Sequence, residues 1–246
     1  MTPDSPAPPD SVAAAPQRTP LAHLPTPAVP ADRLGATLGL PAGALWIKHD
    51  DLTGVAGGGN KVRKLEHLVT AAVAVGADTL VTGGGRQSNH VRLTAAVANR
   101  LGLAATVVLA SDPPEHPTGN VVLDEVLAPD IVWAGDLDYY ALEGAIVDES
   151  ERLASEGRRP YLIPVGGASA VGALGYVHAA YELDTQVPGL PLVVVADGSG
   201  GTHAGLVAGF GDHGRVLGVD VGTRPDLDIA VPAMAGATAA LAGRAD

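Results

Sequence analysis

Short apolar segments alternate with longer stretches of helical length along most of this chain, and this alternation restricts the fold more than any other feature. The apolar segments predict strands at residues 44–49, 79–82, 105–110, 131–134, 161–164, 192–196 and 216–219. The stretches between and after them predict helices at residues 61–75, 88–101, 120–127, 139–155, 170–183, 201–210 and 231–242. Seven strands alternating with helices indicate βαβ units, and so a three-layer α/β/α fold with parallel sheets.

Composition limits what such a fold can do here. With 246 residues, 46% of them hydrophobic, the chain can bury a core of its own. The net charge of −12 disfavours nucleic acid and anionic membranes as partners. The sequence has no cysteine, which excludes disulfides and a thiolate nucleophile. No apolar run approaches the roughly 20 residues of a membrane helix, and no secretory signal is evident, so we expect a soluble, cytoplasmic protein.

The N-terminal residues differ in composition from the rest. Residues 1–20 are rich in proline, alanine and small polar side chains. Such a segment buries little apolar surface, and we expect a disordered tail.

In parallel sheets, ligands bind beyond the carboxyl ends of the strands, and there four glycine-rich turns are found. The first turn, Gly-Gly-Gly-Asn-Lys, ends at Lys61, and Lys64 lies on the same face of the helix that follows. Two neighbouring ammonium groups disfavour each other's charged forms, and a lysine of lowered pKa can bond to an aldehyde. Spacing alone equally allows two solvated lysines at a helix start.

The second turn places polar side chains at the start of a helix. It ends in Gln87, Ser88, Asn89 and His90, and a helix N-terminus with a hydroxyl and an amide can hold a carboxylate. The alternative is simple capping, in which Ser88 serves only its own backbone and His90 is an ordinary, partly buried histidine.

The third turn follows the most apolar strand and has the order of a phosphate cradle. It runs from Gly198 through Ser199, Gly200 and Gly201 to Thr202, and a helix follows. His203 stands where a dinucleotide fingerprint needs its third glycine, which disfavours a nucleotide-binding Rossmann protein. The fourth turn, residues 164–169, is glycine-rich and by itself could be only a turn.

Taken together, these turns resemble one family. The residues that carry the likeness are 49–54 with 58–66, 87–90, 118–120, 160–167, 172–176 and 198–205. They resemble the 1-aminocyclopropane-1-carboxylate deaminase and D-cysteine desulfhydrase family, whose members are pyridoxal-phosphate enzymes with a tryptophan synthase β-like fold. The similarity runs in order from about residue 21 to the end of the chain.

The resemblance implies roles for the residues of the turns. Lys61 would carry pyridoxal phosphate and move protons at the substrate Cα, and Ser88 would share in catalysis. The substrate would be held by Ser88, Asn89 and His90. The cofactor would be bound by Asn60, Lys61, Lys64, Asn89, Gly198, Ser199, Gly200, Gly201 and Thr202.

The resemblance also predicts a domain division and marks three departures. A large domain would comprise residues 21–63 and 165–246, and a small α/β domain residues 64–164. Relatives continue well past the position of Asp246, so we expect the large domain to be incomplete at its C-terminus. Asp197 precedes the phosphate turn, where a carboxylate is unfavourable unless it points away or pairs. Arg86 replaces a usually apolar residue.

The implied reaction is α,β-elimination with deamination of a small amino acid, foremost D-cysteine, by a homodimer. Ring opening of 1-aminocyclopropane-1-carboxylate and a sulfo-lyase activity are alternatives within the family. An alternative of another class is an inactive remnant that acts only in cofactor binding or interaction.

Overall fold

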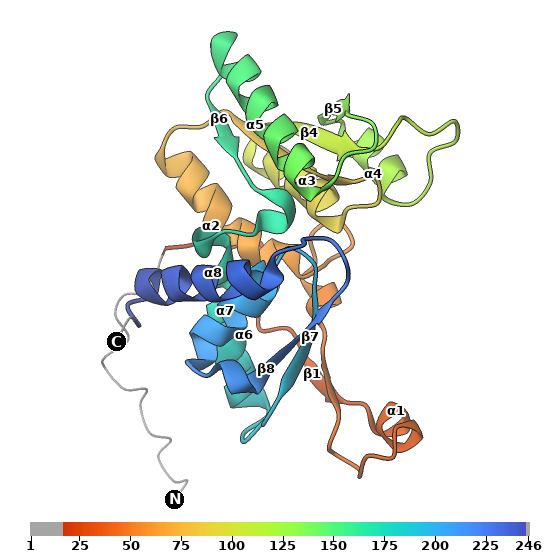
Figure 1. The fold of residues 1–246 in the computed structure, drawn as a ribbon, viewed down its shortest axis with the longest axis vertical. Helices are drawn as coiled ribbons and strands as arrows, with labels where there is room; N and C mark the ends of the chain where they lie inside the picture. The colour runs from red at the N-terminus through yellow and green to blue at the C-terminus, as the bar shows by residue number, and fades with distance from the viewer. Residues whose placement is uncertain (1–16, 245–246) are drawn as a thin grey trace, which may run out of the picture.

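The computed structural model describes residues 17–244, whose elements form two groups that meet at helix α2 (Figure 1). The upper group in this view is built on a four-stranded parallel sheet in the order β5-β4-β3-β6. Its strands are β3 (Thr79–Gly85), β4 (Ala104–Ala110), β5 (Asp130–Trp133) and β6 (Pro160–Leu162). Its helices are α3 (Asn89–Leu101), α4 (Asn120–Leu127) and α5 (Tyr139–Ser155). The prediction of an α/β fold is confirmed.

Alternating side chains explain why this sheet is covered on both faces. On β4, Val107 and Leu109 pack with Val91 of α3, whereas Val108 packs with Ile146 of α5. Successive strand residues point to opposite faces, so an unbroken apolar strand needs a helix on each side. Helices α3 and α5 therefore cover opposite faces of this sheet.

The lower group in Figure 1 surrounds a two-stranded parallel sheet. Its elements are α6 (Ala170–Gln186), β7 (Val193–Asp197), α7 (Gly201–Phe210), β8 (Val216–Asp220) and α8 (Leu227–Leu241). Val193 and Val195 pack toward α6 and α7, whereas Val194 and Leu217 are exposed on the other face of the sheet. One face of this sheet therefore carries the core, and the other presents apolar side chains.

Helix α2 (Lys61–Ala74) joins the two groups. Its apolar residues Leu65 and Val69 share a core with Leu80 of β3. On its other side it approaches α6 so closely that a Cβ at Gly175 would lie 2.2 Å from the carbonyl oxygen of Arg63. The position of α2 is thus fixed by both groups.

Gly175 therefore allows the contact between α2 and α6, and its replacement is expected to be costly. We expect Gly175→Ala to lower the free energy of unfolding by more than about 2 kcal/mol, since backbone must move to admit the methyl group. Gly144 of α5 is exposed and has open space around it, so Gly144→Ala should raise the free energy by about 0.5–1 kcal/mol. Urea denaturation measures both, and equal effects would contradict the packing described.

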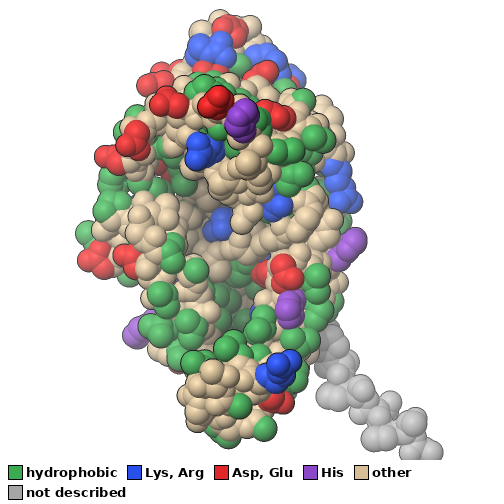
Figure 2. Space-filling view, turned by 90° about the vertical axis from the view of Figure 1, so that its right-hand side faces the viewer, with side chains coloured by type: hydrophobic (Ala, Val, Ile, Leu, Met, Phe, Trp, Pro, Cys, Tyr) green, Lys and Arg blue, Asp and Glu red, His purple; other side chains and the backbone are tan. Residues whose placement is uncertain are grey.

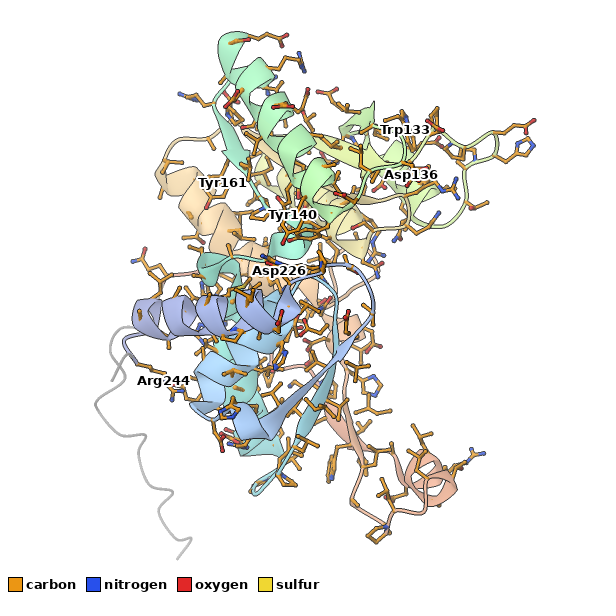
Figure 3. The ribbon with its side chains drawn as sticks, viewed as in Figure 1. Trp133, Asp136, Tyr140, Tyr161, Asp226 and Arg244 are labelled. Atoms are coloured by element: carbon orange, nitrogen blue, oxygen red, sulfur yellow. The ribbon has the colours of Figure 1, made fainter. Side chains whose placement is uncertain are left out.

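Contacts at the junction in front of α2 also join the groups. Tyr140 of α5 and Asp226 before α8 lie next to each other there (Figure 3), and Asp226 raises the pKa of Tyr140. The Arg224 guanidinium pairs with Asp226 at 2.6 Å and lies 5.2 Å from the centre of the Tyr139 ring.

Three parts of the chain differ from the predicted elements. The strand predicted at residues 44–49 is β2 (Trp46–Lys48), and it pairs antiparallel with β1 (Ala28–Pro30) rather than joining a parallel sheet. A short helix, α1 (Asp32–Thr37), lies between them. Helix α8 begins at Leu227, four residues before the predicted start at 231. Pro232 therefore lies inside the helix. The 3₁₀ segments are Asp50–Leu52, Val165–Gly167 and His213–Arg215.

The end of the predicted N-terminal tail is held against α2. The backbone N–H of Thr19 donates to the carbonyl oxygen of Glu66 at 3.1 Å, and Arg18 pairs with the Glu66 carboxylate. Ordered contacts thus begin before residue 20, and residues 1–16 of that prediction lie outside the described residues. Among the helices of residues 17–244, none combines the length and apolar character needed to cross a membrane.

Candidate active site

The loop before α2 holds its shape through glycine. Gly58 has φ +76, and a Cβ there would lie 1.7 Å from the carbonyl oxygen of Asp51, so no other residue fits without rearrangement. The hydroxyl of Thr53 bonds both the N–H and the carbonyl of Gly59 at 3.0 Å. The loop leads directly into α2, whose first residue is Lys61.

Lys61 is half-buried, and its amine has a single hydrogen-bond partner among the described residues. Its Nζ donates to Asn60 Oδ1 at 2.9 Å, and Asn60 Nδ2 in turn donates to Thr202 Oγ1 at 3.2 Å. Burial lowers the pKa of Lys61 to about 8. At pH 7 about one amine in ten is then neutral, against roughly one in three thousand for an ordinary lysine.

The reactivity of Lys61 should follow this lowered pKa. A neutral amine attacks and a charged one does not, so we expect the acetylation rate of Lys61 to rise with pH and to reach half its maximum near pH 8. Mass spectrometry of the cofactor-free protein, compared with a lysine-containing peptide, gives the profile. A midpoint near 10, where free lysine titrates, would contradict the burial that we describe.

Lys64 lies one turn beyond Lys61 and is 1% exposed. Its Nζ donates to the carbonyl oxygen of Gly166 at 3.1 Å, although an ammonium group has three protons to donate. Burial, followed by the charge of Lys61, holds its pKa well below the usual value, whereas Asp197 acts in the opposite direction. A buried lysine amine with one carbonyl partner is suited to receive an anion, whose negative charge would favour its ammonium form.

The phosphate turn predicted at residues 198–202 meets this ammonium. A Cβ at Gly201 would lie 2.8 Å from Lys64 Nζ, so the absence of a side chain leaves room there. Gly200, with φ +88, is the N-cap residue of α7, and within the described residues no side chain caps the first N–H groups of that helix. Uncapped N–H groups and the helix dipole favour an anion at this point.

Asp197, whose carboxylate would be unfavourable next to a bound phosphate, is paired with His203. Its Oδ2 accepts a hydrogen bond from His203 Nδ1 at 2.7 Å, and the carboxylate is 4% exposed. A side chain at Gly218 would come within 2.7 Å of the same oxygen, so glycine there makes room for the pair.

The fourth turn, residues 164–169, could by sequence have been only a turn. In the structure several candidate site residues lie close to it. A Cβ at Gly166 would lie 2.4 Å from Ser199 Oγ and 3.7 Å from Lys61 Cε. A Cβ at Gly167 would lie 3.4 Å from His90 Cε1 and 3.6 Å from Lys64 Cβ. Both glycines have positive φ, 67° and 63°. The sequence carried a signal for this turn, two consecutive glycines a few residues after a strand.

The motif of residues 87–90 divides into an outer and an inner part. Ser88 caps α3, with its Oγ accepting from Val91 N at 3.3 Å, and Asn89 is exposed. Asn120 at the start of α4, missed as a site residue by the sequence, donates to Asn89 Oδ1 at 3.0 Å and to the Gln87 carbonyl at 2.8 Å. Helix α4 thus fixes the turn that presents Ser88 and Asn89.

His90 is the inner part, only 2% exposed. The Thr82 hydroxyl donates to the Ile163 carbonyl at 2.8 Å, so at its 2.9 Å contact with His90 Nε2 it accepts. Nδ1 then carries a lone pair that has no hydrogen-bond partner within the described residues. Burial, and after it the charges of Lys61 and Lys64, hold the pKa of His90 well below its usual value. His90 is therefore a neutral group behind the site, near the lysines.

A buried ionic cluster anchors the helix that carries both lysines. Arg63, 1% exposed, pairs with Asp50 at 2.9 Å and with Glu182 at 2.8 Å. The Tyr176 hydroxyl donates to Asp50 Oδ2 at 2.6 Å and lies 3.4 Å from the Asn60 carbonyl. Sequence did not predict this cluster, since its members are up to 132 residues apart in the chain (182 − 50).

These features fit pyridoxal phosphate, which bears a phosphate and an aldehyde. The phosphate suits the buried Lys64 ammonium, the space at Gly201 and the uncapped start of α7. The aldehyde suits the half-buried amine of Lys61. Figure 2 shows this face hollowed between the upper and lower parts of the molecule, with blue basic side chains in the hollow.

Comparisons with known sequences point to the same cofactor. A family described as pyridoxal-phosphate dependent enzyme matches residues 19–241. The chain is 46% identical over 204 residues to D-cysteine desulfhydrase of Salmonella paratyphi B, covering 78% of this chain and 57% of that protein. For the Salmonella paratyphi A protein of the same name, identity is 45% over 188 residues, covering 69% and 54%. The chain thus spans little more than half the length of these curated relatives.

Solved structures give the same assignment. The structure of an ACC deaminase homologue superposes with a TM-score of 0.84 at 36% identity, covering 94% of this chain and 71% of that one. A pyridoxal 5′-phosphate-dependent aspartate racemase superposes with a TM-score of 0.60 at 17% identity over 80% of this chain, which shows a shared fold alone. With a family match along residues 19–241 and a lysine and phosphate turn that fit the cofactor, this chain belongs to the pyridoxal-phosphate dependent enzymes.

Proposed function

We propose that this chain is a lyase that eliminates and deaminates a small amino acid, with D-cysteine as the favoured substrate. The observation that carries the proposal is the pair of lysines on α2: the half-buried Lys61, with its lowered pKa, lies one turn from the fully buried Lys64 beside Gly201. The likeness to D-cysteine desulfhydrases at 46% identity supports this choice of substrate. The reaction would convert D-cysteine and water into pyruvate, sulfide and ammonia.

The chain's own groups would divide the work. Pyridoxal phosphate, when bound, supplies the electron sink that stabilises a carbanion at the substrate Cα. Lys61 holds the cofactor and, once its Nζ is free and neutral, takes the proton from Cα. Lys64, with Gly198, Ser199, Gly200, Gly201 and Thr202, binds the phosphate, and Asn60 holds the Lys61 amine in place.

The substrate would be held at the start of α3. The Ser88 hydroxyl and the Asn89 amide are the polar groups at that helix end, where a carboxylate is favoured. Asn89 would also contact the 3′ oxygen of the cofactor, and Ser88 would assist proton transfer. His90 is buried and neutral, so it would not bind the substrate carboxylate as a cation. It would contribute through Nδ1, which has no hydrogen-bond partner within the described residues.

Ring opening of 1-aminocyclopropane-1-carboxylate is the second candidate. It is favoured by the 36% identity and TM-score of 0.84 with an ACC deaminase homologue. Both substrates share a carboxylate and an amine on one carbon, so the residues described would hold either. Sulfo-lyase activity remains a third option within the family, and cofactor binding without turnover is the alternative of another class.

A pyruvate and sulfide assay tests the proposal. Protein loaded with pyridoxal phosphate should release sulfide and pyruvate from D-cysteine in equal amounts, and far more slowly from L-cysteine. Release of 2-oxobutanoate from 1-aminocyclopropane-1-carboxylate, without sulfide from D-cysteine, would instead select the second candidate. Bound cofactor with no turnover of either substrate would point to the inactive alternative.

The proposal extends to partners and location. A homodimer would bury exposed apolar side chains such as Val194 and Leu217, of the kind found in subunit interfaces. The net charge of −12 supports a small-molecule substrate rather than nucleic acid or an anionic membrane, and accords with a cytoplasmic protein. Sedimentation equilibrium of the cofactor-loaded protein would give the oligomeric state.

A further inference from the structure

Arg92 connects the two halves of the site. It lies on α3 one turn after Ser88, and its side chain points away from solvent at 7% exposure. Its Nη2 donates to the carbonyl oxygen of Gly58 at 2.9 Å. Its Nη1 lies 3.1 Å from the point that a Cβ of Gly57 would occupy. The guanidinium therefore rests against the glycine loop that ends at Lys61.

Asp124 of α4 acts on Arg92 through its charge, although no hydrogen bond or ion pair joins the two side chains within the described residues. It is fully buried, and neither of its carboxylate oxygens has a hydrogen-bond partner within the described residues. Burial raises its pKa to about 6, and the charge of Arg92 opposes that rise. In turn, burial lowers the pKa of Arg92 and the charge of Asp124 opposes that.

These two buried charged groups are not explained by stability alone. A buried polar group left without a hydrogen bond destabilises the fold, and within the described residues the Arg92 Nε has no partner either. The hydrogen bond from Arg92 to the loop before Lys61 gives its side chain another use.

Helices α3 and α4 are joined at their starts. Asn120 at the start of α4 bonds the Gln87 carbonyl and the side chain of Asn89. One turn further along the two helices come Arg92 and Asp124, which influence each other through charge. The loop before Lys61 is then the third segment, held by Arg92 through Gly58.

We propose that Arg92, through its hydrogen bond to Gly58, is a positioning residue that fixes the loop at residues 57–60, and with it Lys61, relative to the Ser88 and Asn89 end of α3. This inference rests on the proposed role of Lys61. Bond formation requires reacting atoms about 3–3.5 Å apart, so a loop displaced by an ångström would impair both cofactor attachment and proton transfer at Cα.

The test compares three substitutions with a matched control. Arg92→Met removes the donor and the charge, Arg92→Lys keeps one donor and the charge, and Asp124→Asn keeps the shape of the carboxylate without its charge. Arg100→Met is the control, because Arg100 lies on the same helix and also donates to a backbone carbonyl, that of Leu21 at 3.2 Å. The readouts are amide hydrogen exchange of the cofactor-free protein and the dissociation constant for pyridoxal phosphate.

We expect Arg92→Met to raise that dissociation constant at least tenfold and to speed amide exchange within residues 57–60, where Gly58 and Gly59 donate backbone hydrogen bonds. Arg92→Lys should stay within about threefold of the unaltered protein, since Arg92 makes one hydrogen bond to the loop rather than a bidentate pair. Asp124→Asn should shift both readouts in the same direction as Arg92→Met, and Arg100→Met should shift neither.

Exchange that rises evenly along α3 and α4, with residues 57–60 unaffected, would overturn the proposal, as would Arg92→Met and Asp124→Asn proteins that match the control. If Arg92→Met does not fold, Asp124→Asn and Arg92→Lys decide by the same readouts. Should the unaltered protein not bind pyridoxal phosphate, the proposed function fails, and the exchange data on cofactor-free protein still decide this inference.

Discussion

Lys61→Ala is expected to abolish covalent attachment of pyridoxal phosphate and to lower D-cysteine turnover by at least about 10⁴-fold. The variant loses both the amine that bonds the aldehyde and the base that takes the Cα proton. The fold should survive, because Lys61 is half-buried and its only hydrogen bond within residues 17–244 joins the neighbouring Asn60. Absorbance of the bound cofactor and a pyruvate assay measure the two losses.

Lys48→Ala provides the matched control, as Lys48 is the one lysine that lies away from the phosphate turn. Its amine bonds the Thr26 carbonyl and the Glu182 carboxylate, both at 2.7 Å. Glu182 keeps Arg63 as a partner, so this variant should retain the cofactor band and turnover. A Lys61→Ala protein with the same spectrum and rate as Lys48→Ala would exclude Lys61 from the chemistry.

Lys64→Met should separate binding from stability. A charge-assisted hydrogen bond to phosphate contributes about 1.5–3 kcal/mol, so we expect a 10- to 100-fold rise in the dissociation constant for pyridoxal phosphate. The cofactor-free protein should become no less stable, because methionine replaces a buried amine whose charged form is disfavoured and whose only hydrogen-bond acceptor in the described structure is the Gly166 carbonyl. Titration with cofactor and urea denaturation give the two quantities.

Lys48→Met should show the reverse pattern, with cofactor affinity unchanged and the free energy of unfolding lowered by up to about 1 kcal/mol through the loss of a partly exposed ion pair. If Lys64→Met instead destabilises the protein and leaves the affinity intact, Lys64 has a structural role and the phosphate binds elsewhere.

Much of the fold could be read from local pattern. Helices at residues 120–127, 139–155 and 201–210 begin and end where predicted, since each lies between clear turn residues. The pairing of β1 with β2 could not be predicted in this way. Each strand has only three residues, and their antiparallel contact depends on a proline-rich segment that carries no periodic signal.

Part of the candidate site could likewise be predicted from the sequence, and part could not. The resemblance grouped Lys61, Lys64 and Gly201 as cofactor-binding residues, and in the structure Gly201 lies next to the Lys64 amine. Strand pattern alone could not give this meeting, because β2, β3 and β7 lie in three different sheets. The pairing of Asp197 with His203 and the contact of Arg92 with Gly58 depend on side-chain directions, which one-dimensional spacing does not give. The roles of Ser88, Asn89 and His90 stay predictions.

The central claim is that one amine, that of Lys61, holds the cofactor. Borohydride reduction of protein mixed with pyridoxal phosphate, followed by proteolysis and mass spectrometry, locates the bond directly. We predict a pyridoxyl label on the peptide that contains Lys61, at that residue alone. A label on Lys48 or Lys64, or none on any lysine, would contradict the account.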